Sequence, residues 1–317
     1  MTHTSAKSVV LFGATGTIGR ATAHALLDAG HRVTCVTRAA SKTRDLPQAV
    51  EIWPVADAAI EPAQMQRFDA VVSCMASRSG DPQDAWAVDY EKQRTILEAA
   101  READLDHFVL LSAICVQKPL LAFQHAKLAF ETLLQDSGLT YSIVRPTAFF
   151  KSLSGQVKRV QEGKPFLLFG DGLGTACKPI SDRDLGRFLA TCLTDRTKHN
   201  RILPVGGPGP AITPRDQAAM VFEATGMTPR FKSVPIGLMD AIIRGLKIGG
   251  IVVPALRRKA ELAKIGRYYA TESMLVWDGE KYDADATPSF GSDTLADHYK
   301  AIVEGNVVAD LGDHAVF

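Results

Sequence analysis

Short apolar runs alternate with helical patterns through the first half of the chain. The runs predict strands at SVVLFG (8–13), HRVTCVTR (31–38), VEIWPVAD (50–57), FDAVVSCMAS (68–77), DHFVLLSAI (106–114) and LTYSIVRPT (139–147). Apolar positions at helical spacing predict helices over 18–29, 86–103 and 127–137. Strands that alternate with helices form a parallel sheet with helices on both faces. We therefore expect an α/β protein with a Rossmann-like, doubly wound parallel sheet.

The pattern changes after Thr147, where segments become shorter and richer in glycine and proline. Helical spacing is found again at 181–194 and 214–225. We expect residues 1–147 to form the first domain and residues 148–317 to form mainly a smaller, substrate-binding portion. The chain is expected to return to the sheet near 178–205, so the two parts would be interleaved.

The segment 235–254 is apolar on most faces but contains Asp240, Arg244 and Lys247. These charges exclude a membrane-spanning helix. We interpret the segment as a buried helix or as a lid over an apolar substrate. Because three basic residues follow at 257–259, peripheral membrane contact through 235–259 is the alternative.

Composition narrows the function classes. The chain of 317 residues has 36 basic and 35 acidic residues, and this balance does not favour a nucleic acid partner. The five cysteines form no C-x-x-C pair, so we expect neither a disulfide framework nor a metal site. The opening MTHTSAKS lacks the apolar core of a signal peptide, and we expect a cytoplasmic protein.

The segment GATGTIG, between the first strand and the first helix, predicts a dinucleotide site. Gly13 permits a tight turn, Gly16 lets the backbone approach a pyrophosphate, and Gly19 allows close helix–strand packing. The helix N-terminus then offers N–H groups and a positive dipole to the phosphates. The predicted turn also includes Thr15, Thr17 and Ile18.

The end of the second strand selects the cofactor. An acidic residue there would bind the ribose hydroxyls of NAD, but this chain has Thr37 and Arg38. The guanidinium of Arg38 suits a 2′-phosphate. We predict NADPH as the cofactor and residues 1–147 as an NADP-binding domain; the alternative is that Arg38 is a solvated surface residue.

The helix after the fifth strand contains AFQHAKLAFE. Short-chain dehydrogenases have Y-x-x-x-K there, with the tyrosine as acid and the lysine on the nicotinamide ribose. This chain keeps Lys127 but has Phe123, which cannot donate a proton, so carbonyl chemistry is disfavoured. Lys127 is therefore a candidate cofactor-binding and catalytic residue, against the alternative of a solvated helix lysine. Ser73 and Ser112, at the ends of the fourth and fifth strands, are further candidate cofactor contacts.

Six blocks, in order along the chain, resemble the divinyl chlorophyllide 8-vinyl reductases, a family of atypical short-chain dehydrogenases. They are SCMASRSG (73–80), FVLLSAICVQKPLLAFQHAKLAFE (108–131), RPTAFFKSLSGQV (145–157), FGDGLGTACKPISDRDL (169–185), LPVGGPGPAITP (203–214) and IGRYYATESML (265–275). The resemblance implies NADPH-dependent reduction of a vinyl group on a chlorophyllide-type tetrapyrrole, in chlorophyll or bacteriochlorophyll biosynthesis. It also implies a place near the photosynthetic membrane. A C=C reductase has no alkoxide to protonate, which agrees with Phe123.

A large, flat, apolar tetrapyrrole would require an apolar cover. Candidate apolar contacts are Phe123, Phe149, Phe150 and Phe166, together with 235–254. Candidate partners for an acidic group of the ligand are Lys151, Lys158, Lys178 and Arg267.

Lys127 is the first candidate for the proton donor, with water and Tyr268 as alternatives. Two other functions stay open. One is a redox sensor of the nitrogen-regulator type, which binds NADP without turnover. The other is an isoflavone-reductase-like reductase of another conjugated alkene. Chlorophyllide and protochlorophyllide are equally compatible with the residues.

Overall fold

The computed structural model describes residues 6–38, 43–55, 60–77 and 80–307. Its main sheet has seven parallel strands in the order β3-β2-β1-β4-β5-β6-β8. These strands are β1 (Ser8–Phe12), β2 (Arg32–Thr37), β3 (Glu51–Pro54), β4 (Ala70–Ser73), β5 (His107–Leu111), β6 (Thr140–Pro146) and β8 (Arg201–Val205). The strand order reverses between β1 and β4, which opens a crevice at the carboxyl ends of the strands. The sheet confirms the predicted fold class.

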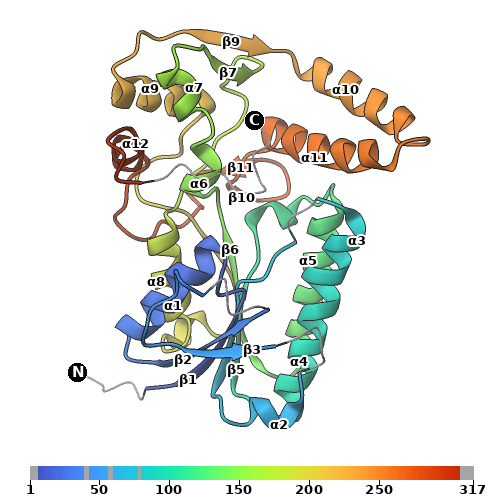
Figure 1. The fold of residues 1–317 in the computed structure, drawn as a ribbon, viewed down its shortest axis with the longest axis vertical. Coiled ribbons are helices and arrows are strands. Elements are labelled where there is room, and N and C mark those ends of the chain that lie inside the picture. Colours follow the sequence, from blue (N-terminus) through green and yellow to red (C-terminus); the bar gives the residue numbers. More distant parts are fainter. Residues whose placement is uncertain (1–5, 39–42, 56–59, 78–79, 308–317) are drawn as a thin grey trace.

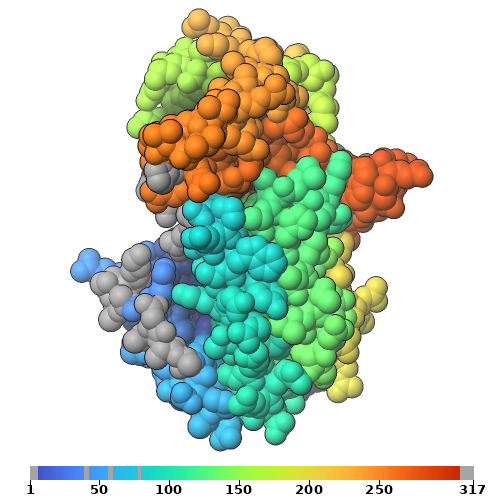
Figure 2. Space-filling view, turned by 90° about the vertical axis from the view of Figure 1, so that its right-hand side faces the viewer, coloured from blue at the N-terminus to red at the C-terminus, as the bar shows by residue number. Residues whose placement is uncertain are grey.

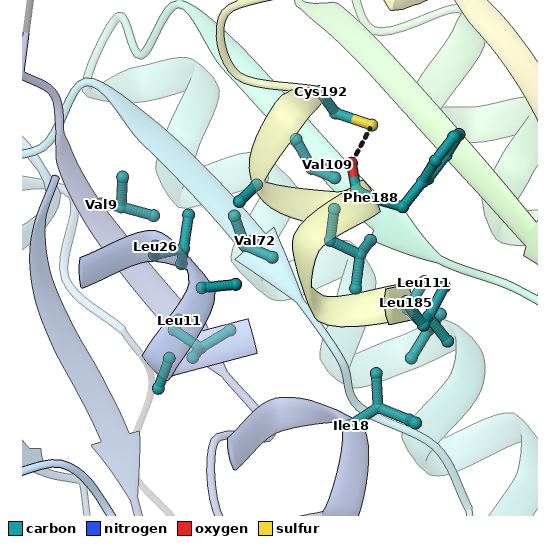
Figure 3. Packing of buried hydrophobic residues seen from close by; sticks show 14 of the residues in the cluster. Val9, Leu11, Ile18, Leu26, Val72, Val109, Leu111, Leu185, Phe188 and Cys192 are labelled. Atoms are coloured by element: carbon teal, nitrogen blue, oxygen red, sulfur yellow. Dashed lines mark hydrogen bonds between the residues drawn. The ribbon is translucent and has the colours of Figure 1, made fainter. Parts of the chain in front are cut away.

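Helices cover both faces of the sheet (Figure 1). The helices α1 (Thr17–Asp28) and α8 (Asp182–Thr191) lie on one face, and α2 (Pro62–Met65), α4 (Lys92–Glu102) and α5 (Ala122–Gln135) lie on the other. Branched side chains of β1, β4 and β5 pack against α1 and α8 (Figure 3). The two helices approach closely because a Cβ at Gly186 would lie 2.7 Å from the backbone of Ala21.

A smaller portion lies over the carboxyl ends of the strands (Figure 1). It contains α6 (Phe150–Leu153), α7 (Val157–Gln161), β7 (Phe166–Phe169), α9 (Pro214–Thr225), β9 (Phe231–Val234) and α12 (Leu295–Val303). Phe166, Phe222 and Tyr299 are buried together in its own apolar core. A short hairpin of β10 (Val276–Trp277) and β11 (Tyr282–Asp283) and the 3₁₀ turns η3 (Ile114–Gln117) and η4 (Arg196–Lys198) complete the connections.

Two helices, α10 (Ile236–Gly249) and α11 (Pro254–Thr271), form an antiparallel pair whose connecting loop projects away from the sheet (Figure 1). Only Met239 and Ile243 of α10 are buried. The interpretation of 235–254 as a buried helix is therefore wrong for its outer face. Among the described residues, none of the helices has the length and apolar character that crossing a bilayer would require.

Helix boundaries differ from the sequence patterns in two places. The helix predicted over 86–103 is preceded by α3 (Pro82–Ala85) and opens with a π-helical segment, η2 (Trp86–Glu91), before α4. The helix predicted from 127 begins at Ala122, because the Gln124 side chain accepts hydrogen bonds from the N–H groups of Leu120 and Leu121 (2.7 and 2.9 Å). This cap fixes the first turn of α5 and so the position of Phe123.

Candidate functional site

The glycine-rich turn joins β1 to α1. Gly13 has φ +74°, and a Cβ there would lie 2.6 Å from the carbonyl carbon of Cys74. A Cβ at Gly19 would overlap the carbonyl oxygen of Gly13. By contrast, a Cβ at Gly16 would meet only that oxygen, at 3.4 Å, so the space in front of the turn is open. No side chain caps the N-terminus of α1, and its N–H groups suit a pyrophosphate.

The end of β2 lies beside this turn, because Leu11 of β1 pairs with Cys35 of β2. Arg38 is exposed immediately after the strand. The Thr37 hydroxyl is buried and has no hydrogen-bond partner within the described residues. An exposed guanidinium and an unsatisfied hydroxyl beside an open glycine turn fit the ribose 2′-phosphate of NADPH.

Lys151 lies at this cofactor turn. Its ammonium is 3.3 Å from the hydroxyl of Thr17, in the first turn of α1. Lys151 is not among the described residues that line the cavity below. This position favours a contact of Lys151 with the cofactor phosphates over one with the substrate.

A cavity of about 610 Å³ opens at the carboxyl ends of β5 and β6, a size typical of small-molecule sites. Its walls come from the segments after these strands, from β7, and from α10 and α11. Most of the lining is apolar and includes Phe123, Phe149, Phe166, Ile236 and Ile265. The cavity can therefore hold a large apolar ligand next to the helix that carries Lys127.

Lys127 is held by a carboxylate that the sequence pattern did not single out. Its ammonium lies 2.9 Å from Oδ1 of Asp89, in η2, and the two side chains are 10% and 1% exposed. Asp89 also accepts hydrogen bonds from the hydroxyl and the N–H of Ser77 (2.6 and 3.4 Å). Lys127, Asp89 and Ser77 all line the cavity. Lys127 is thus not a solvated helix lysine, and it is the only basic residue among the described residues lining the cavity.

The two serines that end strands do not offer free hydroxyls. Ser112 lines the cavity, but its hydroxyl donates to the buried carboxylate of Glu131, which also pairs with Arg145. The Ser73 hydroxyl is fully buried and donates to Gln93 at 2.8 Å. The Ser73 side chain is therefore corrected from a cofactor contact to a core contact.

Tyr268 is not at the cavity. Its hydroxyl lies 3.0 Å from the carbonyl oxygens of Cys115 and Lys118, and burial raises its pKa above the usual range. The neighbouring Tyr269 lines the cavity instead. Tyr268 therefore ties α11 to the segment after β5, and its assignment as proton donor is corrected.

Two further substrate candidates lie elsewhere. Phe150 belongs to the apolar core of the smaller portion. The Lys178 ammonium donates to the carbonyl oxygen of Thr287 at 2.9 Å. Neither Phe150 nor Lys178 lines the cavity. Arg267 is also engaged, in an ion pair with Asp240. Each of these side chains has a structural partner that a sequence pattern does not reveal.

Comparison with known proteins agrees with this geometry. Residues 13–196 match a family model described as NAD(P)H-binding. The chain is 48% identical to the chloroplastic divinyl chlorophyllide a 8-vinyl-reductase of Oryza sativa subsp. indica, over 99% of this chain and 83% of that protein. It is 46% identical to the protein of the same name in Arabidopsis thaliana, over 96% of this chain and 79% of that protein.

The fold also resembles that of the NADPH-dependent quinone oxidoreductase QOR2 of Escherichia coli, in complex with NADPH. The TM-score is 0.67 at 16% identity, over 93% of this chain and 99% of that chain. At this identity the likeness concerns the fold alone. The family suggested by the ordered blocks is confirmed by the whole-length identity: the chain belongs to the divinyl chlorophyllide a 8-vinyl-reductases.

Proposed function

We propose that this chain reduces the C8 vinyl group of a 3,8-divinyl chlorophyllide or protochlorophyllide to an ethyl group, in chlorophyll or bacteriochlorophyll biosynthesis. The observation that carries the proposal is the apolar cavity beside Lys127, in a chain of this family. NADPH, bound along the glycine turn, supplies the hydride. One proton from the protein or water then completes the ethyl group, so that –CH=CH₂ gains one hydride and one proton.

The protein's part is mainly to hold the two reactants in contact. The glycine turn, Arg38 and Lys151 would hold the phosphates at one end of the site. Phe123 and Phe149 would pack against the macrocycle at the other end. Alignment of a bound hydride donor and acceptor can supply much of the rate enhancement without a strong acid.

Two cavity-lining side chains are candidates for the proton donor. Lys127 is the first, because its ammonium is held in the lining by Asp89. Tyr269 is the second, because it lines the cavity. Ser112 is disfavoured because its hydrogen is already donated to Glu131.

The ligand's acidic group would lie toward the cavity mouth. Apart from Lys127, the described lining offers carboxylates (Asp89, Asp171 and Glu272) but no cation to pair with it. Burying an unpaired carboxylate beside these groups would be costly, whereas water at the mouth would solvate it. We place the enzyme in the cytoplasm, or in the compartment equivalent to it, at the periphery of the photosynthetic membrane.

The test is reduction of the pigment itself. Purified protein is incubated with NADPH and divinyl chlorophyllide, and the Soret band is followed; a shift to the monovinyl position is expected. Lys127→Met should lower turnover by about 10²-fold or more if Lys127 is the acid. Tyr269→Phe, with Tyr268→Phe as the matched control one residue away, tests the second candidate.

The alternatives give different results. Binding of NADPH with no Soret shift under any condition would support a redox sensor and contradict the proposal. Oxidation of NADPH by another conjugated alkene, with divinyl chlorophyllide inert, would instead support an isoflavone-reductase-like activity.

A further inference from the structure

The loop between α10 and α11 carries an exposed apolar cluster. Ile248, Ile251, Val252 and Val253 are 69%, 80%, 82% and 46% exposed. Single exposed aliphatic residues are ordinary on protein surfaces, but contiguous ones mark an interaction site. We call residues 247–259 the hairpin tip. It lies at the right-hand end of the helix pair in Figure 1 and faces the viewer in Figure 2.

The apolar cluster is surrounded by positive charge. Arg244 and Lys247 precede it, and Arg257, Arg258 and Lys259 follow it; all five are exposed. Residues 241–260 include no Asp or Glu, although the whole chain has a net charge of only +1. Within the described residues, no ion pair neutralises these five side chains. Five positive charges without an acidic partner in the described part of the chain are therefore gathered around this loop.

We propose that the hairpin tip docks onto an anionic lipid bilayer. Its aliphatic side chains would enter the boundary between headgroups and acyl chains, and its basic side chains would contact anionic headgroups. A second copy of the same tip is a poor occupant, because the four positive charges of each tip would face those of the other. An apolar protein surface would leave the basic side chains without partners.

The same two helices form part of the cavity wall. Ile236 at the start of α10 and Leu262, Ile265 and Tyr269 of α11 line it. Docking of the tip would therefore bring the cavity near the bilayer surface, where an apolar pigment accumulates. This consequence rests on the proposed function, whereas the docking itself does not.

Vesicle co-sedimentation of the full chain, without cofactor or pigment, tests the docking. The parent protein should bind vesicles of phosphatidylcholine and phosphatidylglycerol more tightly than phosphatidylcholine alone, and added salt should weaken binding. Two double variants, Ile251→Ser with Val252→Ser and Arg257→Glu with Arg258→Glu, should each weaken binding about tenfold or more. The control is Lys92→Glu with Arg101→Glu, which reverses two exposed charges on α4.

Equal binding of the parent to both vesicle types, or unchanged binding of both tip variants, would overturn the proposal. A dimer seen by sedimentation velocity without lipid would also overturn it, if the Ile251→Ser, Val252→Ser variant were monomeric. That result would assign the tip to contact with a second copy of the chain. Turnover of detergent-dispersed pigment by this variant separates the docking proposal from the proposed function. If the variant no longer docks but turns over pigment normally, both proposals are supported. Normal docking with no turnover in the parent would contradict only the proposed function.

Discussion

The buried pair of Lys127 and Asp89 allows a quantitative prediction. At a separation of 2.9 Å and an effective dielectric of about 20, the attraction between the two charges is roughly 6 kcal/mol. Asp89→Asn keeps the shape of the side chain but leaves a buried ammonium without a counter-charge. Removing one partner of a buried pair costs about 3–5 kcal/mol. Because the Lys127 side chain is 10% exposed to the cavity, water can hydrate it in part, and we expect a loss near the lower value, about 3 kcal/mol.

Removing the cation of the pair should lower the free energy of unfolding by less than removing the carboxylate does. Lys127→Met removes the cation, but the Asp89 carboxylate keeps its hydrogen bonds from the hydroxyl and the N–H of Ser77. We expect a loss of about 2 kcal/mol in the free energy of unfolding, since hydrogen bonds from Ser77 still stabilise the charge. The double variant should be at least as stable as the more stable single variant, because it leaves no buried charge without a partner.

Urea unfolding at pH 7, followed by far-ultraviolet circular dichroism, measures these free energies, and pigment turnover is measured on the same samples. Asp89 touches Lys127 and not the reacting atoms, so it is a positioning residue. Asp89→Asn should lower kcat in the parent but should not lower it further in the Lys127→Met background. Unchanged urea midpoints in both single variants would refute the energetic reasoning. Multiplicative losses of kcat in the double variant would refute the positioning role.

Three other changes have defined outcomes. Tyr268→Phe should lower the free energy of unfolding by about 1 kcal/mol while leaving kcat unchanged, and a large loss of kcat would restore it as the acid. Lys151→Ala should raise the KM for NADPH about tenfold with little effect on kcat, whereas an effect confined to the KM for pigment would return it to the substrate. Burial lowers the pKa of His107 to about 3 from 6.5, so this neutral imidazole stabilises the fold above pH 6.5 and the contribution is lost as the pH falls toward 3. Urea unfolding at pH 7 and pH 5 should therefore differ by about 2 kcal/mol more in the parent than in His107→Gln, and identical pH dependence would contradict this.

Local patterns were sufficient for the sheet and for the cofactor turn. The six predicted strands are all present, because most of the apolar runs are buried within a parallel sheet and are recognised without tertiary information; β3, at the edge of the sheet, is only partly buried. The GATGTIG turn is equally local, since each glycine is required by a contact within or next to the turn. The Phe123 and Lys127 spacing placed both residues on one face of α5, toward the cavity.

Contacts between distant segments could not be predicted in this way. Asp89 and Lys127 meet only because η2 and α5 pack side by side, and nothing near Asp89 in the sequence indicates a buried cation as its partner. Lys151 meets Thr17 across 134 positions of the chain. Tyr268 and Tyr269 are adjacent and chemically identical, and only the orientation of α11 decides which of them lines the cavity. Hydrophobicity likewise predicted a buried helix at 235–254, since an exposed apolar stretch can have the same composition as a buried one.

The exchange of tyrosine for Phe123 can now be understood from the whole site. In carbonyl reduction the developing charge is on one oxygen, and a phenol at that position protonates it. Hydride addition to a vinyl group conjugated with a macrocycle spreads the charge over many atoms, so a donor fixed at one point gains little. A phenol at position 123 would also bring a hydroxyl into a largely apolar lining, where leaving it without a partner costs about 1–3 kcal/mol. A phenyl ring avoids that cost and adds apolar contact area. Lys127 is retained because Asp89 compensates its charge within the protein, which leaves its other N–H donors available to a nicotinamide ribose or to the reacting carbon.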